Sequence, residues 1–232
     1  EHDPLTGAYN TQTFFEKIDK LIKNRPNEQY CILRFDVAGF KAINESFGLE
    51  EGNRLLRGIA RLIRQRLNLE NEAFARLTAD VFAVCITGGE DKIQHFIHAL
   101  STRLEHYSDT FRVKLFFGVC PVENRRTPAH VLCDWAYLAQ KTIKGSDLTN
   151  YAFYDDALRE RLHGGGIDAL IAVEGFFDMN LQRVAAALRH GDGEEPAVQL
   201  HAADEEVRAA GHAEHFLGAA QLVFRRVGRL GE

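Results

Sequence analysis

Two short segments combine carboxylates with a lysine, and together they could hold a metal ion beside a phosphate. Asp36 directly follows the apolar run 30–35, and Asp80 lies between two β-rich runs. Carboxylates at a strand end and on a neighbouring hairpin can converge on a hard divalent cation, and Mg²⁺ prefers one or two carboxylates plus substrate phosphates. Lys41 lies about one helical turn past Asp36, where its ammonium could meet a phosphate. Each aspartate could equally be a solvated cap, and that alternative stays open at this point.

The elements that must position these residues follow from the periodicity of apolar side chains. The predicted helices cover residues 11–23, 40–47, 50–67, 92–107 and 129–141. The predicted strands cover residues 30–35, 73–77, 81–86, 113–119 and 151–154. Because Thr78-Ala79-Asp80 joins two strands by a short turn, those strands must pair antiparallel. We therefore expect an α/β sandwich on a mixed, largely antiparallel sheet rather than a doubly wound parallel one.

The charge distribution divides the chain into two segments of different character. Residues 1–163 carry 22 basic and 22 acidic side chains, whereas residues 164–232 carry 6 basic and 11 acidic ones. The whole net charge of −5 therefore belongs to the second segment. That segment begins with three glycines and has apolar residues at helical spacing on both sides of a glycine-rich break, which predicts a helical hairpin. We expect a domain over 1–163 and an acidic, alanine-rich helical appendage over 164–232.

Composition also excludes several classes of function. A near-neutral first segment and an acidic second one disfavour nucleic acid as a partner. Four cysteines without a CxxC pair are typical of reduced thiols inside a cell, and no apolar run is long enough to cross a bilayer. Because the sequence opens on Glu1 rather than on methionine, we expect a fragment. The expected location is cytoplasmic, including as the cytoplasmic part of a larger, membrane-anchored protein.

Four motifs in consistent order over residues 2–156 resemble one known family. These are Asp3-Pro4-Leu5-Thr6-Gly7-Ala8-Tyr9-Asn10, the stretch 35–56 around Phe35-Asp36 and Phe40-Lys41, the segment Arg76-Leu77-Thr78-Ala79-Asp80-Val81-Phe82, and the helix with Asp134, Ala136 and Lys141 before Gly145. They are similar to D-x-L-T-G-L-x-N, fDxDxFKxiND, R-x-G-G-D/E-E-F and A-D-x-A-L-Y-x-A-K-x-x-G of the GGDEF domains. Those domains condense two GTP molecules into cyclic di-GMP. The resemblance implies the α/β sandwich of the nucleotidyl cyclases.

The resemblance also implies a site for GTP with Mg²⁺. The implied metal ligands are the Asp36 carboxylate, the Val37 carbonyl and the Asp80 carboxylate. The implied nucleotide-binding residues are Lys41 for phosphate, Asn44 and Asn53 for the guanine edge, and Lys141. Asp80 is the carboxylate that remains of the family signature.

The sequence departs from the family pattern at positions that take part in the reaction of the family. Thr78 and Ala79 replace the two glycines that let the hairpin backbone approach the nucleotide, and Val81 replaces a carboxylate. Ala38 and Asn53 replace two further aspartates. Phosphoryl transfer depends on positioning and electrostatics, so a displaced phosphate costs most of the rate.

We therefore expect a degenerate GGDEF domain without cyclase activity, which binds GTP with Mg²⁺ and regulates an adjacent domain or partner. A working diguanylate cyclase that tolerates an unusual signature is the first alternative. That alternative requires a symmetric dimer presenting two GTP molecules. A structural dimerisation domain without nucleotide is the second alternative.

Two further patterns indicate no function. The family's product-binding motif, R-x-x-D, would fall at residues 69–72, where Leu69 and Glu72 do not match it. Arginines at helical spacing in the predicted helix 50–67 could dock an acidic partner, but such a stripe is more often a solvated helix face.

Overall fold

The computed structural model describes residues 1–146 and 148–163. The helices are α1 (Thr11–Asn24), α2 (Phe40–Phe47), α3 (Leu49–Arg64), α4 (Glu90–Glu105), α5 (Ala129–Ile143) and α6 (Asp156–His163). The strands are β1 (Tyr30–Val37), β2 (Ala73–Thr78), β3 (Val81–Thr87), β4 (Leu115–Pro121) and β5 (Tyr151–Phe153). The predicted helical hairpin lies in residues 164–232, outside the described part of the chain, and the proposed domain boundary stays a prediction.

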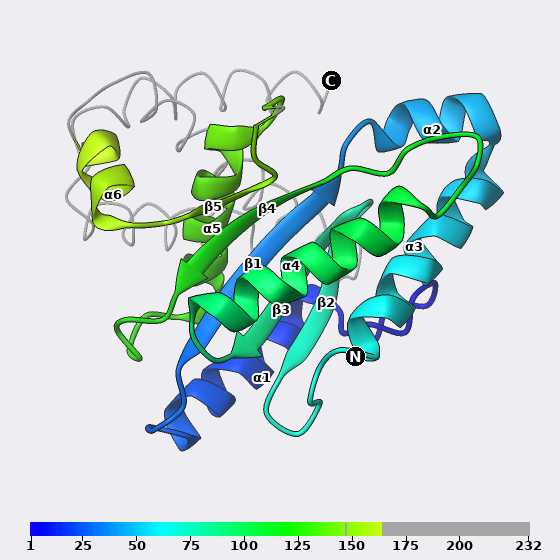
Figure 1. Ribbon diagram of the computed structural model, residues 1–232. Helices are drawn as coiled ribbons and strands as arrows, with labels where there is room; N and C mark the ends of the chain where they lie inside the picture. Colours follow the sequence, from blue (N-terminus) through cyan, green and yellow to red (C-terminus); the bar gives the residue numbers. More distant parts are fainter. Residues whose placement is uncertain (147, 164–232) are drawn as a thin grey trace, which may run out of the picture. The chain divides into compact units, whose positions relative to one another are not determined.

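One five-stranded sheet forms the centre of the domain, in the order β2-β3-β1-β4-β5 (Figure 1). β1 pairs antiparallel with β3 and with β4, β2 pairs antiparallel with β3, and β5 joins β4 in parallel. The expectation of a mixed, largely antiparallel sheet is therefore confirmed. Because β1 lies in the middle, its carboxyl end can meet both the β2–β3 turn and the segment after α5.

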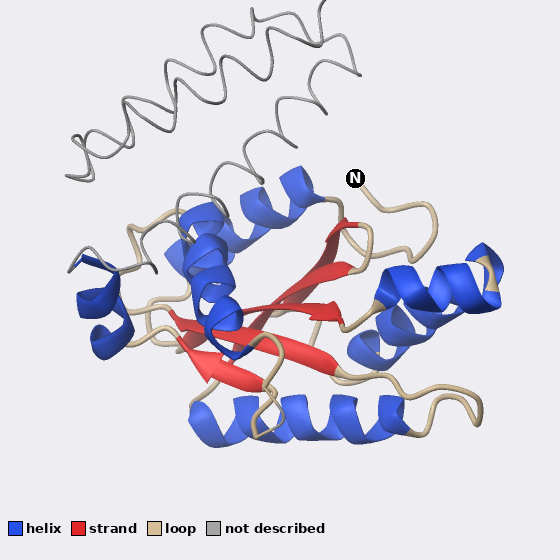
Figure 2. Ribbon diagram, turned by 90° about the horizontal axis from the view of Figure 1, so that it is seen from above, coloured by secondary structure: helices blue, strands red, loops and turns tan. Residues whose placement is uncertain are grey.

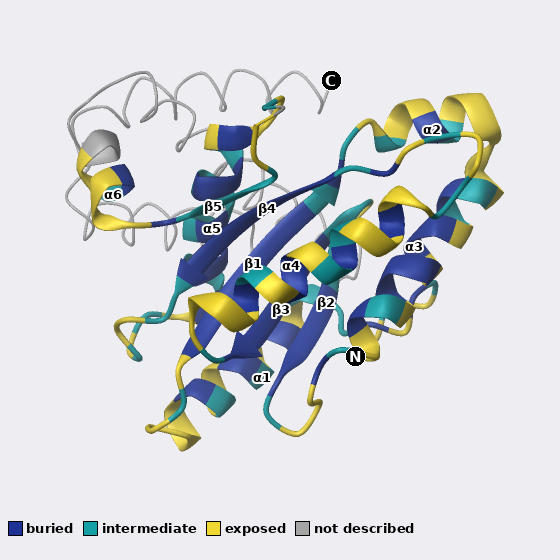
Figure 3. Cartoon of the chain, viewed as in Figure 1, coloured by how far each residue is buried: buried dark blue, intermediate teal, exposed yellow. Residues whose placement is uncertain are grey.

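Helices cover both faces of this sheet (Figure 2). One core contains Leu33 and Phe35 of β1 with the apolar stripes of α3 and α4. The other core contains Ile32 of β1 with the stripes of α1 and α5. Side chains alternate between the two faces of a strand, so Arg34 and Asp36 lie on the α1/α5 side together with Ile32. The buried positions of the strands form a continuous layer between the helices (Figure 3).

Side-chain hydrogen bonds fix where two of the helices begin. The Asn10 side chain caps α1 by accepting a hydrogen bond from the Thr13 N–H at 2.9 Å. α5 begins after Pro128 without a cap of its own, and Asp19 of α1 accepts a hydrogen bond from the Ala129 N–H at 2.8 Å instead. This contact between residues 110 positions apart fixes α5 against α1.

Four elements differ from the predicted ones. α3 ends at Arg64 rather than at residue 67, because the chain turns where the Arg66 N–H bonds to the Ile63 carbonyl. α4 begins two residues early, at Glu90 after Gly89. β4 is shifted two residues towards the C-terminus, to its pairing register with β1. α6 was not predicted, and Leu158 buries it against the α1/α5 core. None of the helices in the described part of the chain combines the length and the hydropathy needed to cross a bilayer.

Candidate functional site

The carboxyl end of β1 brings the two predicted aspartates together. Asp36 is the last residue but one of β1, and Asp80 lies in the turn between β2 and β3. Asp80 Oδ2 accepts a hydrogen bond from the Val37 N–H at 3.0 Å, across 43 residues of sequence. The β2–β3 turn is thereby held against the end of β1, where Asp36, Val37 and Asp80 form one acidic cluster.

Lys144 contributes a cation to this cluster from the end of α5. Its Nζ lies 2.6 Å from Asp36 Oδ2, and the Asp36 side chain is only 14% exposed. The second oxygen, Asp36 Oδ1, is buried and has no hydrogen-bond partner among the described residues. An orphaned carboxylate oxygen is costly unless a ligand satisfies it, so Oδ1 is suited to face a bound group.

The electrostatics of Asp80 reflect its crowded position. Burial is the largest cause and raises the pKa of the Asp80 carboxyl above its usual value, and the nearby Asp36 acts in the same direction. The Val37 N–H and the Lys144 ammonium oppose this rise. An additional cation at the cluster would therefore stabilise the ionised form of Asp80.

The turn that carries Asp80 has an unusual backbone. Ala79 has a φ of +42°, the only positive φ of a non-glycine among the described residues. The left-handed region suits glycine, since a Cβ there crowds the following carbonyl oxygen. Ala79 therefore holds a backbone conformation that glycine favours. Thr78 and Ala79 are both exposed, so their side chains lie on the outer surface of the turn.

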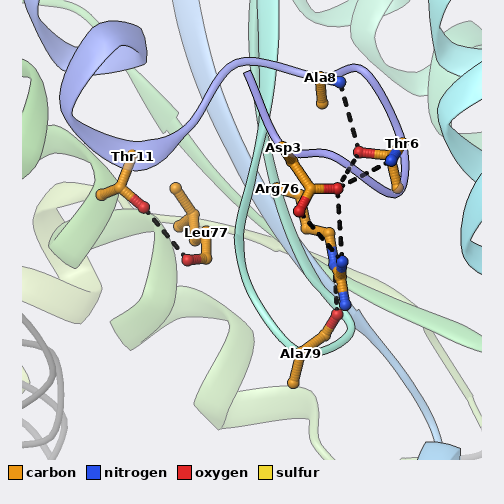
Figure 4. A network of polar contacts seen from close by, with 7 residues as sticks. All are labelled: Asp3, Thr6, Ala8, Thr11, Arg76, Leu77 and Ala79. Atoms are coloured by element: carbon orange, nitrogen blue, oxygen red, sulfur yellow. Dashed lines mark hydrogen bonds and ion pairs between the residues drawn. The ribbon is translucent and has the colours of Figure 1, made fainter. Parts of the chain in front are cut away.

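Arg76 ties this turn to the N-terminal loop (Figure 4). Its Nε donates to the Ala79 carbonyl at 2.6 Å, and its Nη1 lies 3.2 Å from Asp3 Oδ2. The Thr6 hydroxyl donates to Asp3 Oδ1 at 2.6 Å, and the Thr6 N–H donates to the same oxygen. These hydrogen bonds and the Arg76 charge outweigh the effect of burial and lower the pKa of Asp3. The two motifs that frame the site, one at residue 3 and one at residue 76, thus form a single polar network.

The two lysines predicted to bind the nucleotide have different surroundings. Lys41, in the first turn of α2, is 90% exposed and lies 3.7 Å from Glu45. Lys141 lies on α5, with its Nζ 5.0 Å from the centroid of the Tyr137 ring. The Lys41 ammonium is accessible from solvent, and its exposed pair with Glu45 is of the weak kind, so the ammonium can meet a ligand.

Asn44 and Asn53, the predicted guanine-reading residues, lie on α2 and α3, two helices that are in contact. The Asn44 amide lies directly against Gly52, and a Cβ added at Gly52 would overlap the Asn44 side-chain oxygen. This close approach explains why the position next to Asn53 is a glycine. Asn53 follows Gly52 on α3, and Glu50 of the same helix pairs with Arg57. The structure therefore places both amides on one helix pair.

Two residues beside the site were not predicted from the sequence. Lys144 is the first, and Arg34 of β1 is the second. The Arg34 side chain is 7% exposed, and its guanidinium carbon lies 3.9 Å from the Tyr137 ring centroid. Arg34 Nε and Nη1 are buried without a hydrogen bond in the described structure. The sequence signal that could have identified Arg34 is its charge within the otherwise apolar run of β1.

Two other predicted patterns have structural roles. Glu72, at the position of the unmatched product-binding motif, is 1% exposed and bonds to Thr87, Asn68 and Lys92. In the arginine stripe of α3, Arg54 pairs with Glu51 and Arg57 with Glu50, as expected of a solvated helix face.

The donor set at the end of β1 is compatible with magnesium. Asp36 Oδ1, the Asp80 carboxyl and the Val37 carbonyl are hard oxygen donors of the kind that Mg²⁺ takes. Within residues 1–146 and 148–163, no group of three or more histidine, cysteine or acidic side chains could enclose an ion alone. A magnesium ion held here would need oxygens from a ligand such as a phosphate to complete its coordination.

The fold is an α/β sandwich on a five-stranded mixed sheet, with the acidic cluster at the end of its central strand. A family model described as "Diguanylate cyclase, GGDEF domain" matches residues 1–146. The chain belongs to the GGDEF family. The predicted family is thereby confirmed.

Known proteins similar to this chain include cyclases and isolated GGDEF domains. The diguanylate cyclase TpbB of Pseudomonas aeruginosa is 31% identical over 159 residues, which cover 62% of this chain and 36% of TpbB. A structure comprising only the TpbB GGDEF domain matches with a TM-score of 0.61 and 25% identity, covering 70% of this chain and 99% of that one. The GGDEF domain of DgcB from Caulobacter crescentus, in complex with c-di-GMP, matches with a TM-score of 0.60 and 16% identity, covering 66% and 95%. The chain spans 10–36% of the length of the first four curated relatives.

Proposed function

We propose that this GGDEF domain is a signalling module of the cyclic di-GMP pathway that binds GTP with Mg²⁺ and regulates an adjacent domain or partner without forming cyclic di-GMP. The single observation that carries the proposal is the backbone conformation of the β2–β3 turn together with the side chains that it bears. Ala79 keeps the left-handed backbone of a glycine turn, yet Thr78 and Ala79 add side chains on its outer surface. In the family, glycines at these positions let the backbone approach the nucleotide.

Nucleotide binding is supported by what surrounds the turn. Asp36 Oδ1 is buried without a partner, Asp80 is held beside it, and the Lys41 ammonium is accessible from solvent. Asn44 lies in a fixed position against Gly52. These groups can bind a metal-complexed triphosphate and a base. Turnover requires in addition that the phosphates be aligned for attack by a second nucleotide, and the side chains on the turn oppose that alignment.

The test combines a binding measurement with product analysis on the full 232-residue chain. We expect calorimetry to show GTP binding in the presence of Mg²⁺, and we expect chromatography to show no cyclic di-GMP after prolonged incubation. Asn44→Ala should abolish the heat of binding, whereas the matched control Asn24→Ala, an exposed residue at the end of α1, should retain it. Circular dichroism establishes that both variants are folded.

Two outcomes would contradict the proposal. Steady production of cyclic di-GMP, lost in Asp80→Ala, would identify a working diguanylate cyclase. Absence of GTP binding together with a stable homodimer by light scattering would identify a structural dimerisation domain.

A further inference from the structure

Lys144 lies beside the carboxylates of Asp36 and Asp80, where a positive charge stabilises both. Its ammonium is 2.6 Å from Asp36 Oδ2, and its charge also acts on Asp80. Two carboxylates at the end of one strand repel each other, and each is more stable as an anion when a positive charge lies close by. A divalent metal ion would meet the same need. The Lys144 ammonium is therefore a cation of the protein itself at the place where the metal ion is expected.

Lys144 is the lysine that the described part of the chain pairs with Asp36, and other lysines in this region have contacts of their own. Lys41 lies 3.7 Å from Glu45, Lys141 lies over the Tyr137 ring, and Lys114 donates to the Ser146 carbonyl. Lys144 reaches Asp36 because α5 ends at Ile143 and its C-cap residue, Lys144, has an extended backbone with a φ of −62° and a ψ of 118°. Gly145 follows with a φ of +89°, which turns the chain back. The C-terminal geometry of α5 is thus what directs this ammonium to β1.

We propose that Lys144 is an internal competitor of the divalent cation. A divalent ion on the unpartnered Asp36 Oδ1 would lie close to the ammonium that Oδ2 of the same carboxylate holds. Two cations at such a separation repel each other strongly, so the ammonium must leave Asp36 when the metal ion binds the carboxylate pair. The inference rests on the proposed function only for the assignment of Asp36 and Asp80 as the metal-facing pair.

The exchange is physically accessible because the two partners differ in burial. The Lys144 side chain is 50% exposed, whereas that of Asp36 is 14% exposed. Lys144 can therefore swing into solvent on its flexible stem, while Asp36 stays fixed in the sheet. The energetic cost of that release lowers the apparent affinity for the metal. It does not block the site permanently.

The test measures metal binding directly and without nucleotide. Mn²⁺ serves as the probe, and electron paramagnetic resonance reports the free ion in a titration of the full chain. The Lys144→Gln variant lacks the partly buried ion pair that opposes the metal ion. We therefore expect it to bind Mn²⁺ about five- to tenfold more tightly than the unsubstituted chain does. Lys20→Gln, an exposed lysine on α1, removes the same charge elsewhere and should leave the affinity unchanged. Asp36→Asn combined with Lys144→Gln should abolish the gain.

Equal Mn²⁺ affinity in Lys144→Gln and Lys20→Gln would overturn the proposal, as would absence of binding in every variant. A gain that survives the additional Asp36→Asn substitution would also overturn it, because the metal would then bind elsewhere. Failure of the proposed function is distinguishable, since it concerns GTP binding and product formation. A fivefold gain with no GTP binding would support the competition and contradict the nucleotide site.

Discussion

Ala79 has the left-handed backbone that an L-residue with a side chain rarely adopts. The conformation persists because its surroundings hold it in place. Arg76 Nε donates to the Ala79 carbonyl at 2.6 Å, and Asp80 is bonded to the Val37 N–H. A residue in this region costs about 1–2 kcal/mol relative to the right-handed form. The turn is thus strained at one residue, next to the carboxylate that the site needs.

Ala79→Gly should stabilise the domain. Glycine removes the penalty of the positive φ in the folded state, but its greater conformational entropy favours the unfolded chain. Because these effects oppose each other, we expect a net increase of about 0.5 kcal/mol in the free energy of unfolding. Chemical denaturation monitored by circular dichroism measures it. Thr78→Gly is the matched control, because Thr78 lies at the end of β2 and has no positive φ. That variant should lose about 0.5–1 kcal/mol. A loss of stability in Ala79→Gly would contradict the assignment of strain.

At the scale of elements, α5 lies so close to β4 that one position of the strand tolerates no side chain. A Cβ added at Gly118 would overlap the carbonyl oxygen of Ala136 and crowd the Gln140 backbone nitrogen. Gln140 itself is buried and donates from its side chain to the Phe116 carbonyl at 2.9 Å. Because α5 carries Tyr137, Lys141 and the C-cap residue Lys144, this close packing sets the position of three side chains beside the site.

Gly118→Ala should therefore destabilise the domain strongly. Overpacking against backbone atoms, which cannot rotate away, is expected to lower the free energy of unfolding by about 3 kcal/mol. Thermal or denaturant unfolding measures the loss. Gly89→Ala is the control, because a Cβ there meets only the far end of the Gln29 side chain at 3.8 Å. That substitution should cost about 1 kcal/mol or less. Equal effects of the two variants would show that α5 can move away from β4.

For the whole molecule, a buried carboxylate links three parts of the fold and makes stability depend on pH. Glu72 precedes β2, accepts hydrogen bonds from the Thr87 N–H and hydroxyl at the end of β3, and lies 2.7 Å from Lys92 of α4. Burial raises the pKa of Glu72, but the hydrogen bonds from Lys92, Thr87 and Asn68 together lower it below its ordinary value of 4.5. The folded state therefore favours the ionised form.

The pH dependence follows from the direction of that shift. A carboxyl group with a lowered pKa stabilises the folded state above its unfolded pKa, and this contribution disappears as the pH falls through the folded pKa. At pH 7, Glu72→Gln should lose about 2 kcal/mol of unfolding free energy. The difference from the unsubstituted chain should shrink steadily below about pH 4.5. Denaturation series at several pH values measure it, with the exposed Glu90→Gln as control. A difference independent of pH would contradict the role of the Glu72 charge.

The sequence by itself determined the family and the class of sheet. Apolar periodicity located the strands, and the short Thr78-Ala79-Asp80 turn required the two strands that it joins to pair antiparallel. These inferences succeed because they depend on local periodicity and on turn length. The convergence of Asp36 and Asp80 was only a possibility at that stage, because it depends on the pairing of β1 with β3, which neither signal specifies. Apolar periodicity did not predict the helix α6, because its burial depends on Leu158 rather than on a full apolar stripe.

Only the tertiary structure decided which cation accompanies the acidic pair. Lys144 and Asp36 are 108 residues apart, and the register of α5 against β4, fixed at Gly118, places one beside the other. The contact of Arg34 with Tyr137 and the caps that Asp19 provides for α5 have the same origin. Sequence patterns report which face a residue occupies, but not which side chain of another element reaches it. The partner of Asp36 is set by how tightly a helix and a strand pack.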